Sequence, residues 1–271
     1  MKPTTKAIIL ARGLGTRMRR VDPHAQVDPA QKSAADLGLK GMIPFGRPFF
    51  DYIISGLADA GCTDVCLVIG PEHETVRDYY GRIELSRVRV HFAVQERALG
   101  TADAVLAAES FAAGEHVLAV NSDNYYPVHT LRALRQLGRA GVAGFERSAL
   151  VRLSNIDAER VAQYSVIEFD DSGLLIRVIE KPDARTLAAL GPEVYVGMNS
   201  WSLPPQIYQA CRSIVPSPRG ELELQSAVQY ARDQLGIPFH VLAFHDGVLD
   251  LSNRTDIAVV SQLLQGVEPR L

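Results

Sequence analysis

Short apolar runs alternate with amphipathic segments along the first half of the chain. Two segments with apolar residues at helical spacing, 49–57 and 102–111, end before Gly61 and Gly114. Strands that alternate with helices of this length indicate right-handed βαβ crossovers and a mostly parallel sheet with helices on both faces. We therefore predict an α/β, Rossmann-like fold. The predicted strands of this half are residues 7–10, 65–69, 88–94 and 117–120.

The pattern changes in the second half. Residues 164–169 and 174–179 read as two strands around the turn sequence Asp-Asp-Ser-Gly at 170–173, which predicts a hairpin. A linker rich in Pro, Gly or Ser does not divide the chain, so we predict a single domain over 1–271 with a soft boundary near residue 140. The second half, 141–271, is expected to be the smaller α+β portion. Its predicted helices are 183–190, 204–214, 222–235 and 255–264.

Composition narrows the class of partner. The net charge is -3 with 22% charged residues, so the chain has no basic field for nucleic acid, and a small-molecule partner is expected. The first apolar run is only about five residues long, and no stretch approaches about 18 apolar residues. We therefore expect no membrane association and a cytoplasmic protein. The three cysteines are expected to be reduced structural thiols.

The first apolar run leads directly into a loop that contains Gly13 and Gly15, followed by Arg17. Both glycines are expected to adopt positive φ and to turn backbone N–H groups toward an anion, beside the fixed charge of the arginine. The loop lacks the Gly-Lys-Ser/Thr ending of a Walker A motif, and Met18 stands where a dinucleotide fingerprint needs a small residue. The alternative reading is a tight strand-to-helix turn with a surface arginine.

Other polar residues also follow predicted strands. Gln95 comes after 88–94 and Asp123 shortly after 117–120. Ligands of parallel α/β sheets bind at the carboxyl ends of the strands. We therefore expect the glycine loop, Gln95 and Asp123 to belong to one site.

Seven short motifs occur in an order that one family shows, and they span nearly the whole chain. They are residues 10–18, 40–44, 95–102, 180–182, 216–223 and 248–250, together with Asp123. With these motifs the chain resembles the sugar-1-phosphate nucleotidylyltransferases, close in pattern to the glucose-1-phosphate thymidylyl- and uridylyltransferases. The resemblance implies a fold of the nucleotide-diphospho-sugar transferase type, with a nucleotide-binding half and a sugar-phosphate-binding half.

The implied reaction transfers a nucleotidyl group from a nucleoside triphosphate to a sugar 1-phosphate and releases pyrophosphate. A sugar 1-phosphate is largely dianionic near neutral pH, so it can attack the α-phosphorus without a general base or a covalent nucleophile. The site must instead neutralise the negative charge of the two phosphate groups, which requires Arg, Lys and Mg²⁺.

The resemblance assigns roles residue by residue. Arg17 is expected on the β- and γ-phosphates, Lys40 near the α-phosphate and Lys181 on the sugar phosphate, as the catalytic cations. Asp123 and Asp250 are the expected Mg²⁺ ligands. The expected nucleotide-binding residues are Leu10, Ala11, Arg12, Gly13, Gly15, Thr16, Gln95, Gly100 and Thr101. The expected sugar-phosphate-binding residues are Glu180, Lys181, Gly197 and Ser165.

Several questions stay open at this level. Lys32 rivals Lys40, because the segment 21–39 is longer than the family's usual connection and is either a lid or a surface excursion. Arg12 replaces a small residue, and either adds a phosphate contact or crowds the nucleoside. UTP or dTTP is the expected nucleotide, the alternative being a guanylyltransferase acting on mannose 1-phosphate or an unusual sugar phosphate. A paralogue that senses nucleotides without turnover, and a homo-oligomer, both remain possible.

Overall fold

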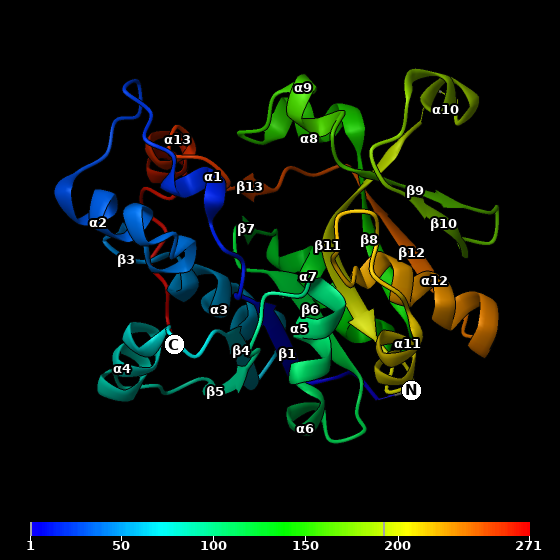
Figure 1. Ribbon diagram of the computed structural model, residues 1–271, viewed down its shortest axis with the longest axis horizontal. Coiled ribbons are helices and arrows are strands. Elements are labelled where there is room, and N and C mark those ends of the chain that lie inside the picture. The colour runs from blue at the N-terminus through cyan, green and yellow to red at the C-terminus, as the bar shows by residue number, and fades with distance from the viewer. Residues whose placement is uncertain (1, 192) are drawn as a thin grey trace.

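The alternating apolar runs of the first half form the parallel strands of a sheet. The computed structural model describes residues 2–191 and 193–271, and in this part of the chain the main sheet has nine strands (Figure 1). Its parallel portion runs in the order β6-β1-β4-β5, so the α/β prediction is confirmed. These four strands are β1 (Lys6–Leu10), β4 (Asp64–Ile69), β5 (Arg89–Val94) and β6 (Val117–Asn121).

The second half extends the same sheet with mainly antiparallel pairs. Strand β11 (Tyr195–Leu203) pairs antiparallel with β6, β8 and β9, and so joins the two halves of the chain. The predicted hairpin is present as β9 and β10, whereas the sequence pattern missed β8, β11 and β12. Glycines at 141, 144 and 197 interrupt the apolar runs of β8 and β11. The remaining strands are β8 (Gly141–Glu146), β9 (Ser165–Phe169), β10 (Leu175–Ile179) and β12 (His240–Phe244).

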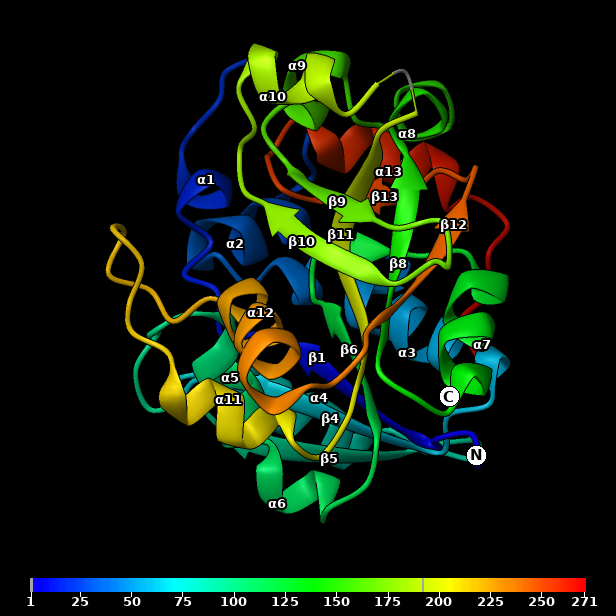
Figure 2. The same cartoon turned by 90° about the vertical axis from the view of Figure 1, so that its right-hand side faces the viewer.

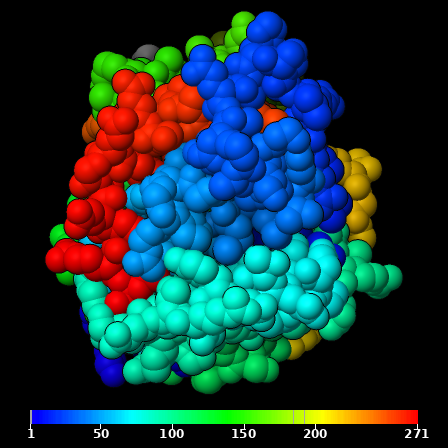
Figure 3. Space-filling view, turned by 90° about the vertical axis from the view of Figure 1, so that its left-hand side faces the viewer, coloured from blue at the N-terminus to red at the C-terminus, as the bar shows by residue number. Residues whose placement is uncertain are grey.

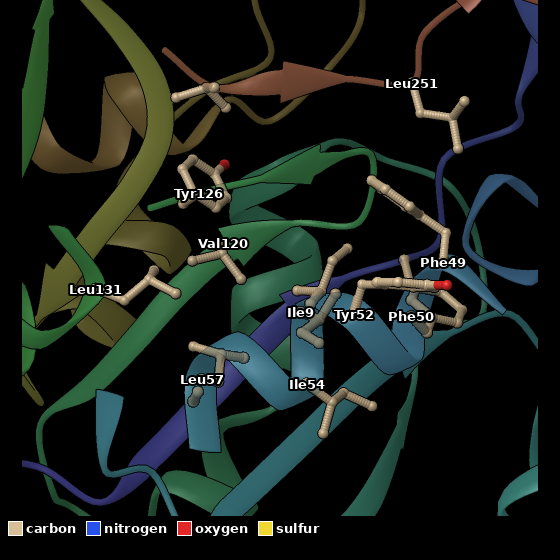
Figure 4. Close-up of a cluster of buried hydrophobic side chains, with 14 of the residues drawn as sticks. Ile9, Phe49, Phe50, Tyr52, Ile54, Leu57, Val120, Tyr126, Leu131 and Leu251 are labelled. Atoms are coloured by element: carbon tan, nitrogen blue, oxygen red, sulfur yellow. The ribbon is translucent and has the colours of Figure 1, made fainter. Parts of the chain in front are cut away.

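Helices cover both faces of the sheet (Figure 2). Along β1, Ala7 and Ile9 face one core, whereas Ile8 and Leu10 face the other. The first core is closed by α3 and α7, and the second by α5, α11 and α12. Figure 4 shows side chains of the first core, among them Phe49 and Leu57 of α3 together with Ile9 of β1 and Val120 of β6. These helices are α3 (Phe49–Ala60), α5 (Thr101–Ala107), α7 (Val128–Leu137), α11 (Ile207–Ser213) and α12 (Leu224–Leu235).

Shorter elements complete the fold. The predicted helix 102–111 is divided at Ala108 into α5 and α6. The other helical elements are α1 (Thr16–Arg19), α2 (Pro29–Leu37), η1 (Lys40–Met42), α4 (Glu74–Arg82), α6 (Glu109–Ala112), α8 (Arg147–Leu153), α9 (Ala158–Val161), α10 (Ala184–Ala189) and α13 (Asp256–Leu263). Two small sheets pair β2 (Pro44–Phe45) with β3 (Arg47–Pro48), and β7 (Asn124–Tyr125) with β13 (Leu249–Asp250).

The segment 21–39 is ordered around α2, which has a full N-terminal capping box. The Asp28 carboxylate accepts a hydrogen bond from the Gln31 backbone N–H, and the Gln31 side chain accepts one from the Asp28 N–H. Figure 3 shows this blue segment beside the red C-terminal part of the chain. The side chain of Arg254 connects the two, because it donates to the Met18 carbonyl at 2.7 Å and also pairs with Asp36.

Among the residues described, no helix is both long enough and apolar enough to cross a bilayer. Cys62, Cys66 and Cys211 are buried free thiols, and burial raises the pKa of each thiol to about 12.

Candidate active site

The glycine loop connects β1 to the single turn of α1. Gly15 has φ +60°, and a Cβ built there would lie 2.4 Å from the Gly38 carbonyl oxygen, so glycine is required by both conformation and space. Gly13 is not among the residues with positive φ, so that expectation for Gly13 is wrong. The end of the 21–39 segment therefore packs directly on the loop and forms its outer support.

A cavity of about 400 Å³ lies beside this loop at the carboxyl ends of β1 and β6. Most of the predicted nucleotide-binding residues line it, and Ala11 and Gly15 instead line a smaller neighbouring cavity of about 60 Å³. We call the larger space the nucleotide cavity. The predicted residues on its wall are Leu10, Arg12, Gly13, Thr16, Gln95, Gly100, Thr101 and Asp123.

Gln95 is buried at this wall in a fixed orientation. Its amide nitrogen donates to the Gly100 carbonyl at 3.1 Å and to the Asp103 carboxylate at 2.7 Å. Both partners can only accept, so the amide nitrogen must face them and the amide oxygen is left for another donor. Gly100 also lines this cavity, and a Cβ there would lie 2.4 Å from the Leu222 carbonyl oxygen, so the close approach of Leu222 requires a glycine as well.

Arg12 is held by protein groups at the edge of the nucleotide cavity. Its guanidinium pairs with Glu72 at 2.8 Å and donates to the Gln95 carbonyl at 3.2 Å. Its charge is therefore already matched by a carboxylate. The side chain fixes the backbone of Gln95 in addition to bordering the cavity.

The structure separates the two rival lysines. Lys40 lies 2.8 Å from the carboxylate of Asp123, and both line the small cavity beneath the glycine loop. Lys32 instead pairs with Asp36 one turn further along α2, and 59% of its side chain is exposed. Lys40 is therefore the lysine that reaches the site.

Asp123 and Asp250 are brought together by the pairing of β7 with β13. Asp250 pairs with Asn124 in this small sheet, and the Leu251 N–H donates to the Asp123 carbonyl at 2.8 Å. Burial raises the pKa of Asp250, and the nearby charge of Asp123 raises it further.

Four side chains already donate to the Asp250 carboxylate. Arg160 and Tyr164 donate to one oxygen at 2.7 and 2.6 Å, and Ser252 and Asn124 donate to the other at 2.8 and 3.4 Å. Arg160 also forms an ion pair with Asp256 at 2.6 Å. The sequence prediction missed Arg160, because it lies in the four-residue helix α9 and no motif marks it.

Magnesium binds through one or two carboxylates together with substrate phosphates and water. Asp123 fits this role, because among the residues that the structure describes a single side chain, that of Lys40, donates to its carboxylate, and a phosphate can attract this lysine in turn. Asp250 lies close to Asp123 but has its hydrogen-bonding capacity used by protein donors. Within 2–191 and 193–271 there is no cluster of three or more His, Cys, Asp or Glu side chains arranged to hold a metal.

A second cavity, of about 480 Å³, contains the predicted sugar-phosphate residues, and we call it the sugar cavity. Lys181 lines it with φ +43°, an uncommon conformation for a lysine that fixes the start of its side chain. Burial raises the pKa of Glu180, and the charge of Glu223 adds to this effect. Its lining residues are Arg17, Gln163, Tyr164, Ser165, Glu180, Lys181, Gly197, Asn199, Arg219 and Gln225.

Two findings in the sugar cavity bear on the sequence analysis. Arg17, expected on the outer phosphates of the nucleotide, lines the sugar cavity and is exposed. A Cβ at Gly197 would lie 2.9 Å from the Ser165 hydroxyl, so these two small residues shape the cavity wall together. Asn199 and Gln225 were missed, because a single amide in a strand or helix carries no sequence signal.

Comparisons with known proteins identify the family and the fold of this chain. The profile of the family described as Nucleotidyl transferase matches residues 6–237. The glucose-1-phosphate thymidylyltransferase of Streptomyces antibioticus is 28% identical over 98% of this chain and 68% of its own length. The UTP–glucose-1-phosphate uridylyltransferase AglF of Haloferax volcanii is 26% identical over 82% of each chain. A UDP-glucose pyrophosphorylase solved with UDP-glucose has the same fold, with a TM-score of 0.74 and 18% identity over 99% of this chain and 100% of its own.

Proposed function

The chain belongs to the nucleotidyl transferase family, and we propose that it joins a nucleoside triphosphate to a sugar 1-phosphate to give an NDP-sugar and pyrophosphate. The observation that carries the proposal is a pair of adjoining cavities of about 400 and 480 Å³, each lined by groups suited to one of the two substrates. The glycine loop borders the first cavity, and Lys181 and Glu180 border the second.

The chemistry requires that two anions approach within bonding distance. The oxygen of the sugar phosphate attacks the α-phosphorus, a new P–O bond forms, and the bond to the β-phosphate oxygen breaks as pyrophosphate leaves with its electron pair. Lys181 and Arg17 lower the repulsion around the sugar phosphate, and Lys40 does so at the triphosphate. Asp123 would hold Mg²⁺ with Asp250 beside it, and the bound ion would neutralise phosphate charge.

The orientation of Gln95 supports a base that carries a ring N–H group. Its amide oxygen is the acceptor that Gly100 and Asp103 leave unused. Uracil and thymine offer an imide N–H to such an acceptor, as guanine does with its N1–H, whereas N3 of cytosine and N1 of adenine carry no hydrogen. Because curated relatives are named as a thymidylyl- and a uridylyltransferase, UTP or dTTP is the substrate that we propose, and CTP is expected to be a poor one.

The test measures pyrophosphate release with Mg²⁺ for the nucleoside triphosphates, each combined with a panel of sugar 1-phosphates. The proposal predicts release that requires both substrates and is fastest with UTP or dTTP. Asp123→Asn is expected to lower this rate by roughly 10²-fold or more while the fold is retained. Tight nucleotide binding with no release from any pair would contradict transfer and favour a nucleotide-sensing protein, and a preference for GTP would contradict the pyrimidine assignment.

A further inference from the structure

One residue, Asn199, lies on the walls of both cavities. No other residue in the described part of the chain lines both the nucleotide cavity and the sugar cavity. If the two substrates occupy the two cavities, the α-phosphorus and the attacking oxygen must meet where the cavities adjoin. Asn199 therefore borders the place where the new bond forms.

The strand that carries Asn199 is distorted at this position. In the pairing of β11 with β8, Gly197 lies opposite Gly144 and Trp201 opposite Val142, so four steps along β11 match two along β8. The two extra residues form a bulge, and Asn199 within it has φ +53°. Bulges near active sites redirect a side chain, and left-handed backbone at a non-glycine residue costs of order 1–3 kcal/mol.

Two hydrogen bonds hold the bulge and its amide. The Tyr126 hydroxyl donates to the Met198 carbonyl at 2.6 Å, which fixes the backbone just before Asn199. The Gln225 amide nitrogen, from α12, donates to the Asn199 side-chain oxygen at 2.9 Å. With this oxygen engaged, the amide N–H₂ group of Asn199 is the part that is free to meet a ligand.

We propose that the Asn199 amide donates a hydrogen bond to the phosphoryl group that is being transferred, and so acts as a catalytic residue at the junction of the two cavities. This inference rests on the proposed function, because it assumes that the two cavities hold the two substrates. A fixed neutral donor at the reacting phosphate stabilises the charge that is redistributed in the transition state, and loss of one such donor typically costs 10²–10³-fold in kcat.

The decisive variant is Asn199→Gly, because glycine keeps the positive φ and removes only the amide. Ala113 has the same φ of +53° and does not line either cavity, so Ala113→Gly is the matched control for relief of backbone strain. Both variants are expected to be at least as resistant to thermal unfolding as the parent chain. In the pyrophosphate assay, kcat should fall roughly 10²-fold for Asn199→Gly and less than about twofold for Ala113→Gly.

A binding measurement keeps the inference testable without turnover. Calorimetry with UDP-glucose probes a ligand whose pyrophosphate spans the junction, and UMP probes the nucleotide cavity alone. The inference predicts that Asn199→Gly weakens UDP-glucose binding about tenfold and UMP binding less than about twofold. Gln225→Ala is expected to weaken UDP-glucose binding by a smaller factor, because the Asn199 amide stays in place but loses the hydrogen bond that orients it.

The outcomes separate the two proposals. If the parent chain binds UDP-glucose but releases no pyrophosphate, the proposed function fails, and the binding contrast alone decides the role of Asn199. If Asn199→Gly keeps kcat and UDP-glucose affinity within about threefold of the parent, the amide has no such role and the residue serves only the bulge. Failure of the parent chain to bind either probe, and dTDP-glucose and TMP in their place, would overturn both proposals.

Discussion

At the scale of single residues, the role of each side chain in this site depends on the group that it contacts. Lys40 and Lys32 are both plausible cations in the sequence, and spacing does not choose between them. In the structure Lys40 meets the Asp123 carboxylate in a partly buried cavity, and Lys32 forms an exposed pair within one helix. A cation in a protected site has a far larger effect on phosphate charge than one screened by water.

Replacement of the two lysines by methionine tests this assignment. Lys40→Met is expected to lower kcat by roughly 10²–10³-fold, because the variant lacks the positive charge that we propose beside the reacting phosphates. Lys32→Met is expected to change kcat less than about twofold, since exposed i,i+4 ion pairs contribute little. The measurement is steady-state pyrophosphate release, with circular dichroism as the check on folding. A large loss for Lys32→Met with a small one for Lys40→Met would reverse the assignment.

Some residue-level features could not be obtained from the sequence. Arg160 reaches Asp250 across 90 positions of the chain, and this contact depends on how α9 and β13 are placed in three dimensions. Gln95 could be named from its motif, but the direction of its amide is set by Asp103 and by the Gly100 carbonyl. The sequence pattern thus identifies side chains that can bind a ligand, whereas tertiary contacts determine how those side chains are oriented.

At the level of elements, the glycine loop and the 21–39 segment form one unit. Gly15 and Gly38 are in backbone contact, and Arg254 holds the carbonyl of Met18 next to the same loop. The segment is helical because Asp28 and Gln31 cap α2 and Pro29 occupies its first turn. The segment therefore supports the backbone of the glycine loop from outside the cavity.

Two glycine-to-alanine variants test whether the contact between Gly15 and Gly38 stabilises the fold. Gly15→Ala is expected to lower the free energy of unfolding by roughly 1–3 kcal/mol, because alanine is strained at φ +60° and its Cβ would overlap the Gly38 backbone. Gly13→Ala is the control, since a Cβ there meets nothing within 4 Å and its φ is not positive. Urea denaturation of the two variants gives the comparison. Equal losses of stability would refute the contact with Gly38.

The elements that the sequence predicted well are those with uninterrupted apolar periodicity, namely β1, β4, β6 and α3. Strand β11 was missed because Gly197, Asn199 and two serines interrupt its apolar alternation. Asn199 lies in a bulge and lines both cavities, so the segment lacks the pattern of a regular strand. Strands β7 and β13 are only two residues long, so no periodicity can reveal them. The features that were hardest to predict therefore lie at the site itself.

At the scale of the whole molecule, one sheet carries both cavities. The parallel strands end at the nucleotide cavity, and the antiparallel extension through β11 carries the sugar cavity. Because β11 pairs with β6 directly, the two cavities are held at a fixed separation. This arrangement suits direct transfer between two bound substrates, with no need for the chain to carry the nucleotidyl group itself.

Exchange of labelled pyrophosphate into the nucleoside triphosphate is the measurement that tests direct transfer most simply. Direct transfer predicts that label enters the triphosphate only when the sugar 1-phosphate is present, because the reverse reaction needs an NDP-sugar. The exchange should disappear in the Asp123→Asn variant. Rapid exchange without any sugar phosphate would reveal a covalent nucleotidyl-enzyme and would contradict the account.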